Sequence, residues 1–529
     1  MVFKELHSLG AAYMRRSLAL VLMTVIISIP HAHSSEQSVF PRVQFLGAAQ
    51  MVGGASYLID TGKTRLLVDC GLFYGAEHQD KNKQLQFDPA SIDFVLLTHA
   101  HIDHAGRIPL LYKKGFTGQT IGTDATKDIS GIMLEMSMDI ARETPEPLFD
   151  FPDYKNFMDR YRTVDYGRIV ELSTDVSIRL VEAGHILGSA IAEIWIKTDK
   201  GQVKIVVASD LGHKGTPILR DPAYVSDADY VIIESTYGTV NRRPFDYHEF
   251  GAVIQDTLKS GGSVLIPAFV LEKTQKVLFT IGKLKREGVI PADVPVYADS
   301  TSASRITWFY AKYKKYYDDE ALGLLSDSNA PLAFQGLSWV SGKQSRAINT
   351  AGGKAIYLTS SGMMDHGNAP RLLEVMATNP KNLLLIVGWQ SPESLGRTLQ
   401  EGARLVSFPI EEYERGVKTT RTVNTPVLMK VQKFDGFSSH ADGAEIMNWL
   451  AHLASTRKVF VVHGEKASAL GLAGAIHEQL GFNASAPAMQ ETVILSSETA
   501  IHKMKKPVTI NAAGKRDDDV GVSGGICDQ

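Results

Sequence analysis

The sequence predicts an α/β layered fold that is interrupted by a second α/β unit. Short apolar strands alternate with helical periodicity from residue 43 onward, and a cluster of histidine and aspartate residues follows one of those strands. After this series of strands, roughly two hundred residues pass before another site-like motif, which is the length of an inserted domain. The chain has 529 residues of which 44% are apolar, so it can bury more than one core.

Composition limits the chemistry that the chain can use. Lys plus Arg number 55 and Asp plus Glu number 58, so the net charge of -3 attracts no polyanion globally and any nucleic-acid affinity must be local. The two cysteines, Cys70 and Cys527, support neither a disulfide framework nor a thiolate zinc site. A metal ion must therefore rely on histidine and aspartate.

The amino-terminal segment has the order of features that is typical of a secretory leader. Arg15 and Arg16 precede an apolar run over residues 18–29, and small residues follow. We expect residues 1–38 to be a signal peptide or an amino-terminal anchor, with Met14 as an alternative start. A signal peptide implies an exported or periplasmic protein without stable membrane association after cleavage, whereas the alternatives are a membrane-anchored or a cytoplasmic protein.

The first strands and helices follow in order from residue 43. Apolar runs bounded by Gly and Asp predict strands, and apolar residues recurring at three and four predict helices. Strands are expected at 57–60, 65–71, 94–98, 178–181, 191–196, 203–208 and 230–233, and helices around 108–112 and 129–141.

Residues 98–104 read Thr-His-Ala-His-Ile-Asp-His, directly after an apolar strand. Because side chains alternate along a strand, His99 and His101 share one face, while Asp103 and His104 come from the following turn. Imidazole nitrogen and carboxylate oxygen suit Zn²⁺, and this many ligands can hold two ions. The pattern predicts a metal site, because a chance cluster of buried core histidines would rarely have this spacing.

Three further residues occupy suitable positions at strand ends. His185 lies in Gly-His-Ile-Leu-Gly, where the flanking glycines allow a sharp turn, and Asp210 ends an apolar strand with a carboxylate that can bridge two cations. Asp69 ends another strand. Taken singly, an aspartate at a strand end is more often a turn or helix cap, and only the joint pattern favours a metal site.

In order along the chain, Asp69, the residues 99–104 cluster, His185 and Asp210 resemble the four metal-site motifs of the metallo-β-lactamase superfamily. The resemblance implies an αββα sandwich with a dinuclear zinc centre at one edge of its two sheets. It implies that His99, His101 and His185 bind one zinc ion, that Asp103 and His104 bind the other, and that Asp210 bridges them. Asp69 is then expected to orient a ligand histidine by hydrogen bonding.

A second α/β series follows Glu234. Its rhythm includes an apolar strand within residues 261–269, a helix that reaches residue 284, and strands near 355–358 and 383–387. Two further histidines that we expect to be exposed come afterwards, His440 in Phe-Ser-Ser-His-Ala-Asp and His463 at a strand end in Val-Val-His-Gly-Glu. The chain therefore returns to its first domain.

This arrangement resembles the β-CASP branch of the superfamily, which contains messenger-RNA 3′-end cleavage factors, RNase J and their prokaryotic relatives. Glu234 matches the first insert motif and His440 the last, where the resemblance implies the ligand that completes the second zinc site. The predicted division is a leader over 1–38, a metallo-β-lactamase domain over 39–240 and 426–500, a β-CASP insert over 241–425, and a disordered tail over 501–529.

The residues that complete catalysis are expected in the return segment and the insert. In the cleavage factors a histidine follows a Gly-Tyr segment, whereas Thr398 stands near that place here, and His463 is the candidate replacement as general acid. The alternative for His463 is phosphate binding or a structural role. We expect the catalytic residues to be Asp69, Asp103, Glu234 and His463. We expect the substrate-binding residues to be Ser361, Gly362, Trp389 and Arg397.

The predicted function is hydrolysis of single-stranded RNA by a zinc-dependent ribonuclease, with two Zn²⁺ per chain and attack by a metal-bridging hydroxide. One alternative is a different metallo-hydrolase acting on a lactam, a thioester or a small phosphodiester. Another is a non-catalytic RNA-binding scaffold. The sequence leaves homo-oligomerisation, endonucleolytic or exonucleolytic action, and the preference for RNA over DNA open.

Overall fold

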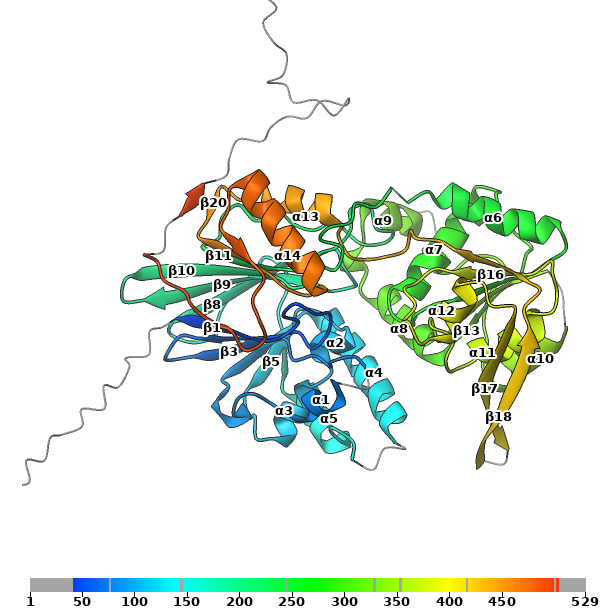
Figure 1. Ribbon diagram of the computed structural model, residues 1–529, viewed down its shortest axis with the longest axis horizontal. Coiled ribbons are helices and arrows are strands. Elements are labelled where there is room, and N and C mark those ends of the chain that lie inside the picture. The colour runs from blue at the N-terminus through cyan, green and yellow to red at the C-terminus, as the bar shows by residue number, and fades with distance from the viewer. Residues whose placement is uncertain are drawn as a thin grey trace, which may run out of the picture. The chain divides into compact units, whose positions relative to one another are not determined.

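A computed structural model describes residues 41–503, except residues 76–77, 143–145, 244, 327–329, 352–353, 415–416 and 499–500. The predicted leader and nearly all of the predicted tail lie outside the described residues. Within them, no helix combines the length and the apolar character needed to cross a membrane. The strands form three large sheets, two of which face each other (Figure 1).

The first sheet has seven strands in the order β23-β1-β2-β3-β4-β5-β6. Strands β1, β2 and β3 pair antiparallel, whereas β3 to β6 run parallel. Its strands are β1 (Arg42–Gly47), β2 (Ser56–Asp60), β3 (Arg65–Val68), β4 (Phe94–Leu96), β5 (Gln119–Gly122), β6 (Tyr161–Thr163) and β23 (Thr492–Ile494). The intervening helices are α1 (Gln79–Lys83), η2 (Pro89–Ser91), α2 (Ile102–Ala105), α3 (Ile108–Lys113), α4 (Asp124–Ala141) and α5 (Phe151–Asp159).

The second sheet also has seven strands, in the order β22-β21-β11-β10-β9-β8-β7. Strands β7 to β10 pair antiparallel, whereas β10, β11, β21 and β22 run parallel. Its strands are β7 (Ile169–Glu171), β8 (Val176–Glu182), β9 (Ala190–Thr198), β10 (Gly201–Ala208), β11 (Tyr230–Ile233), β21 (Lys458–Val461) and β22 (Ala484–Ser485). Helices α13 (Gly443–Leu450) and α14 (Lys466–Ala475), which runs into η4 (Ile476–Leu480), follow the return of the chain.

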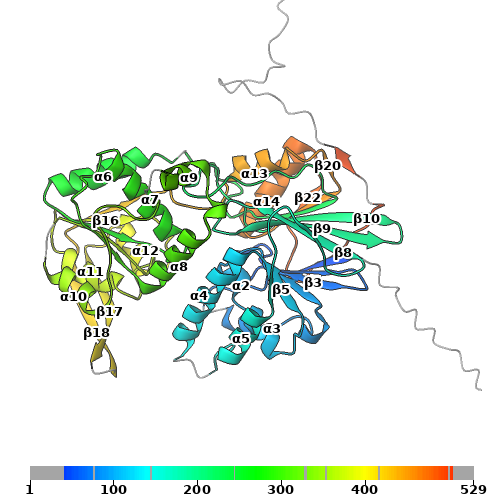
Figure 2. The same cartoon turned by 180° about the vertical axis from the view of Figure 1, so that it is seen from behind.

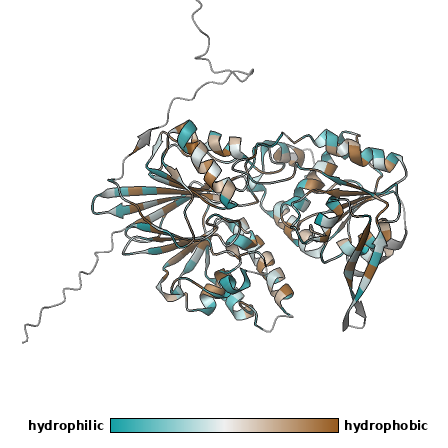
Figure 3. Cartoon of the chain, viewed as in Figure 1, coloured by the Kyte–Doolittle hydropathy of each residue, from teal (hydrophilic) through white to brown (hydrophobic). Residues whose placement is uncertain are grey.

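Apolar side chains pack on both faces of each of these sheets, which gives four layers. Phe45 and Tyr57 of the first sheet meet Ile205 and Phe460 of the second in a core between the sheets. The outer face of the first sheet packs against α3 and α5, and that of the second against α13 and α14. The helices therefore cover the outside of a two-sheet sandwich, and hydrophobic residues concentrate on its strands (Figures 2 and 3).

The third sheet is entirely parallel, in the order β14-β13-β15-β12-β16-β19. We call this sheet and its helices the insert. Its strands are β12 (Val264–Pro267), β13 (Val296–Asp299), β14 (Leu337–Trp339), β15 (Ile356–Thr359), β16 (Leu383–Ile386) and β19 (Lys430–Lys433). Its helices are α6 (Tyr247–Lys259), α7 (Lys273–Arg286), α8 (Thr301–Lys312), η3 (Lys314–Tyr316), α9 (Asp319–Ser326), α10 (Gly342–Ala351), α11 (Ala369–Met376) and α12 (Leu395–Gln400). A hairpin of β17 (Leu405–Glu414) and β18 (Val417–Pro426) packs with α11 on one face.

Two segments differ from the divisions predicted above. Strand β19 pairs with β16, so the insert sheet continues past residue 425, where the sequence placed the end of the insert. Near the end of the described chain, β24 (His502–Lys503) pairs with β20 (Ser455–Thr456), so two residues of the predicted tail form a strand. Both differences arise from backbone pairing of short polar segments, which carry little hydrophobic periodicity.

Candidate metal centre

The predicted site residues lie where strands of the sandwich end at one edge. Strands β3 and β4 run parallel in the first sheet, and Asp69 and His99 follow them. Strands β10, β11 and β21 run parallel in the second sheet, and they are followed by Asp210, Glu234 and His463. Because parallel strands end at the same edge of a sheet, side chains from distant parts of the sequence converge there.

The first group of metal-type donors comprises His99, His101, His185 and Asp210. The Nδ1 atom of His101 lies 3.1 Å from Nε2 of His99 and 3.1 Å from Nε2 of His185. Asp210 Oδ2 lies 3.4 Å from His99 Nε2 and 3.3 Å from His185 Nε2. One donor atom from each residue lies within 4.8 Å of all the others.

The second group comprises Asp103, His104 and His463. His463 Nε2 lies 3.2 Å from His104 Nε2 and 3.3 Å from Asp103 Oδ2. Asp210 adjoins this group through its other oxygen, because Oδ1 is 3.2 Å from His104 Nε2. The carboxylate of Asp210 therefore faces the first group with one oxygen and the second group with the other.

These donor sets fit zinc. Tetrahedral zinc with ligands at about 2.0–2.1 Å needs donor atoms roughly 3.3 Å apart, and the separations in the first group match that requirement. The facing imidazole nitrogens and the Asp210 oxygens carry lone pairs that converge on one point, where a cation would accept them. Asp210 Oδ1, which faces the second group, is also buried without a hydrogen-bond partner in the described part of the chain.

Burial keeps the histidines of the first group neutral. It lowers the pKa of His101 to about 3, and electrostatic repulsion between the His101 and His99 rings adds to the effect. Burial likewise lowers the pKa of His99 and, far more strongly, that of His185, where His440 contributes. Neutral imidazole is the form that binds a metal ion, so these side chains need no deprotonation to act as ligands near pH 7.

The carboxylates impose the opposite shift on the second group. Burial opposes charge on His104, but Asp210 and Asp103 outweigh it and raise the pKa of His104 well above its ordinary value. Burial also disfavours the charged form of Asp210, yet His104 and His463 hold the pKa of this carboxyl well below its usual range. The site therefore holds a buried anion beside a cluster of imidazoles, which is the charge pattern that a cation requires.

Asp69 makes the contacts of a residue that orients a ligand. Its Oδ2 lies 2.8 Å from His104 Nδ1, and it accepts hydrogen bonds from the Thr98 hydroxyl at 2.8 Å and the Ser209 hydroxyl at 3.1 Å. The Thr98 backbone N–H donates to the other oxygen at 2.8 Å. These contacts direct Nε2 of His104 toward the second group.

His440 pairs with Glu234. Its Nδ1 lies 2.9 and 3.0 Å from the two oxygens of the Glu234 carboxylate, which is fully buried. The carboxylate also accepts from the Leu211 backbone N–H at 2.7 Å. The His440 side chain is 20% exposed, whereas that of His463 is 2% exposed. The His440 ring is therefore fixed at one nitrogen and is more exposed than His463.

The two histidines after the insert differ in their neighbours. His440 was predicted to bind the second metal ion and His463 to be the candidate acid, and it is His463 that lies with Asp103 and His104. His440 lies in a further candidate group with Asp210 and His463, in which its Nδ1 is 3.9 Å from Asp210 Oδ2. Neither local motif, Phe-Ser-Ser-His-Ala-Asp or Val-Val-His-Gly-Glu, records which histidine faces Asp103 and His104.

The structure places three of the four predicted substrate-binding residues at the carboxyl edge of the insert sheet. Ser361 and Gly362 follow β15, and the exposed Trp389 follows β16. The Gln390 amide donates to the Gly362 carbonyl at 2.9 Å and connects the two loops. Phe269, after β12, packs against Gly362, where a Cβ would lie 2.9 Å from its backbone nitrogen.

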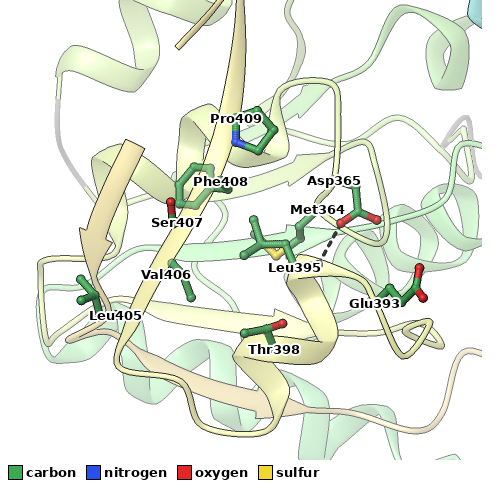
Figure 4. A pocket seen from close by; sticks show the side chains of 10 residues that line it. All are labelled: Met364, Asp365, Glu393, Leu395, Thr398, Leu405, Val406, Ser407, Phe408 and Pro409. Carbon is green, nitrogen blue, oxygen red and sulfur yellow. Dashed lines mark hydrogen bonds between the residues drawn. The ribbon is translucent and has the colours of Figure 1, made fainter. Parts of the chain in front are cut away.

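The fourth, Arg397, lies on α12 and forms an ion pair with Glu401 of the same helix at 2.6 Å. Thr398, its neighbour, lines a pocket between α12 and β17 (Figure 4), and its hydroxyl donates to the Ser394 carbonyl at 3.2 Å. None of the side chains drawn around this pocket belongs to either donor group. Thr398 therefore does not stand in for a histidine of the metal centre.

Several polar residues of this site were not predicted from the sequence. Thr98 and Ser209 bond to Asp69, and the hydroxyl of Thr236 lies 3.2 Å from His463 Nδ1. Each directly follows, or lies within three residues of, the end of a strand that carries a site residue. A polar residue at such a strand end was the available signal.

Three family models match the chain. Residues 50–162 match the Metallo-beta-lactamase superfamily, residues 274–399 match the Beta-Casp domain, and residues 424–487 match the Zn-dependent metallo-hydrolase RNA specificity domain. Ribonuclease TTHA0252 of Thermus thermophilus is 33% identical over 434 residues, which cover 82% of this chain and 95% of that protein. This chain belongs to the β-CASP branch of the metallo-β-lactamase superfamily.

Other relatives of this β-CASP protein agree. Transcription termination factor FttA of Pyrococcus abyssi is 31% identical over 480 residues, covering 86% of this chain and 71% of that protein. A protein of unknown function from Enterococcus faecalis has a similar fold, with a TM-score of 0.51 and 11% identity over 86% of this chain and all of the other. The predicted αββα sandwich with an α/β β-CASP insert is confirmed.

Proposed function

We propose that this β-CASP protein is a zinc-dependent ribonuclease that hydrolyses phosphodiester bonds in single-stranded RNA. The observation that carries the proposal is the convergence of two donor groups on the carboxylate of Asp210. Two zinc ions held there would acidify water and neutralise the charge that develops on the reacting phosphate. The names of the relatives, a ribonuclease and transcription termination factors, and the RNA specificity description of one family model support RNA as the substrate.

The ligand set follows the donor groups. His99, His101 and His185 would hold one ion, and Asp103, His104 and His463 the other, with Asp210 shared. Asp69 would fix the ring of His104 through the 2.8 Å contact with Nδ1, which keeps Nε2 directed at the ion.

We propose that His440 gives a proton to the leaving oxygen. Glu234 contacts Nδ1 of His440 at 2.9 Å and would hold the ring in one orientation, as a carboxylate does for a catalytic imidazole. The partial exposure of His440 leaves its second nitrogen accessible to a substrate. An alkoxide is a poor leaving group, so a proton donor here is expected to contribute about 10²–10⁴-fold to the rate.

The insert would bind the RNA. Ser361, Gly362, Trp389 and Arg397 remain the residues we propose for this task, with Trp389 stacking on a base and Arg397 contacting phosphate. The domain division stated above also remains a proposal, with the end of the insert moved beyond β19 because that strand completes its sheet.

The function is tested with end-labelled RNA and DNA oligonucleotides and zinc-loaded full-length protein. We expect the wild type to cleave RNA and Asp103→Ala to lose cleavage, while Asp139→Ala, an exposed carboxylate on α4, stays fully active. Elemental analysis should find about two zinc ions per wild-type chain. Product lengths separate endonucleolytic from exonucleolytic action. Folded, zinc-loaded wild type that cleaves neither nucleic acid contradicts the proposal.

The same preparation decides between the alternatives. A lactam, thioester or small-phosphodiester hydrolase would turn over such substrates faster than RNA, and an RNA-binding scaffold would bind RNA equally well after Asp103→Ala. We further propose that residues 1–38 direct export. Amino-terminal sequencing of protein recovered from each cell fraction tests this, since an exported mature chain should begin near residue 39 and a retained leader contradicts cleavage.

A further inference from the structure

A buried ion pair at the start of α7 contacts the segment that carries His440. Lys276 is 1% exposed and Glu272 is 3% exposed, and Lys276 Nζ lies 3.1 Å from Glu272 Oε1. The same ammonium donates to the Ser439 hydroxyl at 2.9 Å. Ser439 directly precedes His440, so a side chain of the insert reaches the residue next to the proposed proton donor.

The carboxylate of this pair is fixed from its other side. Glu272 Oε2 accepts a hydrogen bond from the hydroxyl of Tyr310 on α8, and Tyr310 is fully buried. Glu272 itself has a φ of 65°, in the left-handed region that favours glycine, and it directly precedes α7. The chain Tyr310, Glu272, Lys276, Ser439 therefore runs from α8 to the His440 segment through buried polar contacts.

Two other cations bind the same segment, which we call the His440 loop (residues 437–442). Lys273 Nζ donates to the Phe437 carbonyl, and the Arg242 guanidinium donates to the His440 carbonyl. On its other side the loop is held by the sandwich backbone, because the Ser439 carbonyl accepts from the His213 N–H at 2.9 Å. Among these cations, Lys276 is the one that contacts the loop through a side-chain hydroxyl.

Such a buried pair is a costly way to stabilise a fold. Removing two charges from water costs several kcal/mol for each ion, and well-packed apolar residues often stabilise a protein as much as an ion pair does. Hydrogen bonds are directional, however, so a buried ion pair can fix the position of a neighbouring side chain in a way that apolar packing cannot. The ammonium of Lys276 joins Glu272 to Ser439, and it can do so only while α7 is docked against the His440 loop.

We infer that Lys276, held by Glu272, is a positioning residue that sets Ser439 and thereby orients His440 toward the leaving oxygen. This inference rests on the proposed function, in which His440 donates the proton. It makes the proton-transfer step depend on the contact between α7 of the insert and the His440 loop. Lys276 touches neither donor group, so the inference predicts a loss in proton donation with metal binding preserved.

The test compares two substrates that differ in their need for a proton. The leaving group in RNA is an alkoxide, which needs a proton as it departs. The leaving group in bis(4-nitrophenyl) phosphate is a stable phenolate, which departs without one. The variant is the full-length double substitution Glu272→Gln with Lys276→Met, which removes both buried charges together. Ser439→Ala is a second, milder variant. The matched control is Lys285→Met, because Lys285 is a buried lysine of α7 whose ammonium donates to carbonyls of the insert and lies over the ring of Phe334, also in the insert.

For the double variant and for Ser439→Ala, we expect kcat on RNA to fall by about 10–100-fold, with KM within twofold, zinc content unchanged and turnover of the activated diester within threefold. Lys285→Met should leave the ratio of the two activities at the wild-type value. Equal losses on both substrates, or no loss on RNA, overturn the inference, because a purely structural pair would affect the two substrates alike.

A readout without turnover separates this inference from the proposed function. In ¹⁵N-histidine spectra, the ring signals of His440, identified by their absence in His440→Gln, should move in the double variant and stay in place in Lys285→Met. An unmoved His440 signal overturns the inference even if RNA is cleaved. If the wild type cleaves neither substrate, the proposed function fails, while the same spectra still show whether Lys276 sets the surroundings of His440.

Discussion

The donors contributed before the insert and His440, contributed after it, are held by different parts of the chain. His185 and His104 are braced within the sandwich, the first by the Ser189 hydroxyl, which accepts from its backbone N–H at 3.1 Å, and the second by Asp69. His440 is braced by Glu234 of the sandwich and also by Arg242, which precedes α6, and through Ser439 by Lys276 of the insert. We call the donors before the insert the near half of the site, and His440 and His463 the remote half.

The two halves contribute unequally to metal binding. The near half contains a complete four-residue donor group, so it can hold an ion without any contribution from the insert. The remote half supplies a metal-type donor to the second group and also the proposed proton donor, and both residues follow the insert in the sequence. Substitutions in the two halves should therefore have different consequences.

The largest effect is expected at Asp210, where the halves meet. Asp210→Ala removes the carboxylate that faces both donor groups, so zinc content should fall toward zero and RNA cleavage by about 10³-fold or more. Elemental analysis and initial rates measure both. A variant that keeps two zinc ions contradicts a shared carboxylate.

The two remote histidines should differ from each other. His463→Ala should lose about one of two zinc ions, because its Nε2 lies with Asp103 and His104, whereas His440→Ala should keep both. His440→Ala should still lose about 10²–10⁴-fold in kcat on RNA. If His440→Ala loses the ion and His463→Ala keeps it, the original prediction from the sequence is right and the roles proposed here are wrong.

A smaller effect is expected at Asp69, which contacts a donor of the near half and is not itself a donor. Asp69→Asn weakens the contact that orients His104, so zinc affinity should fall by about 10–100-fold. Competition with a chelator measures the change. Asp60→Asn is the control, because Asp60 lies in the same sheet but pairs with Arg42. An affinity that is equal for both variants shows that Asp69 does not act on the metal.

The smallest effect concerns a buried carboxyl in the near half. Glu182 accepts from the Gly184 N–H, next to His185, and burial raises the pKa of Glu182 from 4.5 to about 8. The folded state therefore favours the protonated form, and this contribution to stability is complete below about pH 4.5 and is lost as the pH rises toward 8.

Replacement by Gln keeps the hydrogen bond and removes the titration. Glu182→Gln should match the wild type at pH 5 and melt higher by roughly a few °C at pH 8, as thermal unfolding at both values will show. The exposed Glu171→Gln on β7 should give no such divergence. A constant difference in Tm across this range contradicts the buried carboxyl as its cause.

Local pattern was enough to predict the near half from the sequence. The run around residues 98–104 combines strand alternation with a turn, and Asp69, His185 and Asp210 each end or follow an apolar strand. The alternation of strands and helices likewise predicted the sandwich and the insert, because each core strand carries its own hydrophobic run.

Local pattern was not enough for the remote half. The local sequence around His440 and His463 does not identify their partners, and only the tertiary arrangement shows that His463 faces Asp103 and His440 faces Glu234. Glu272 and Lys276 read as an ordinary surface pair four residues apart on a helix. Lys276 contacts Ser439, which is 163 residues further along the chain, and hydrophobic periodicity carries no information about a contact over that separation.

The order in which the halves appear along the chain also bears on synthesis. A ribosome releases the near donors first and the residues of β21 and His463 last, after the whole insert has emerged. With the roles proposed above, a polypeptide that ends before residue 440 would carry the first donor group without His463 or the proposed proton donor. Such a fragment is expected not to cleave RNA, so activity would arise only once most of the chain has been translated.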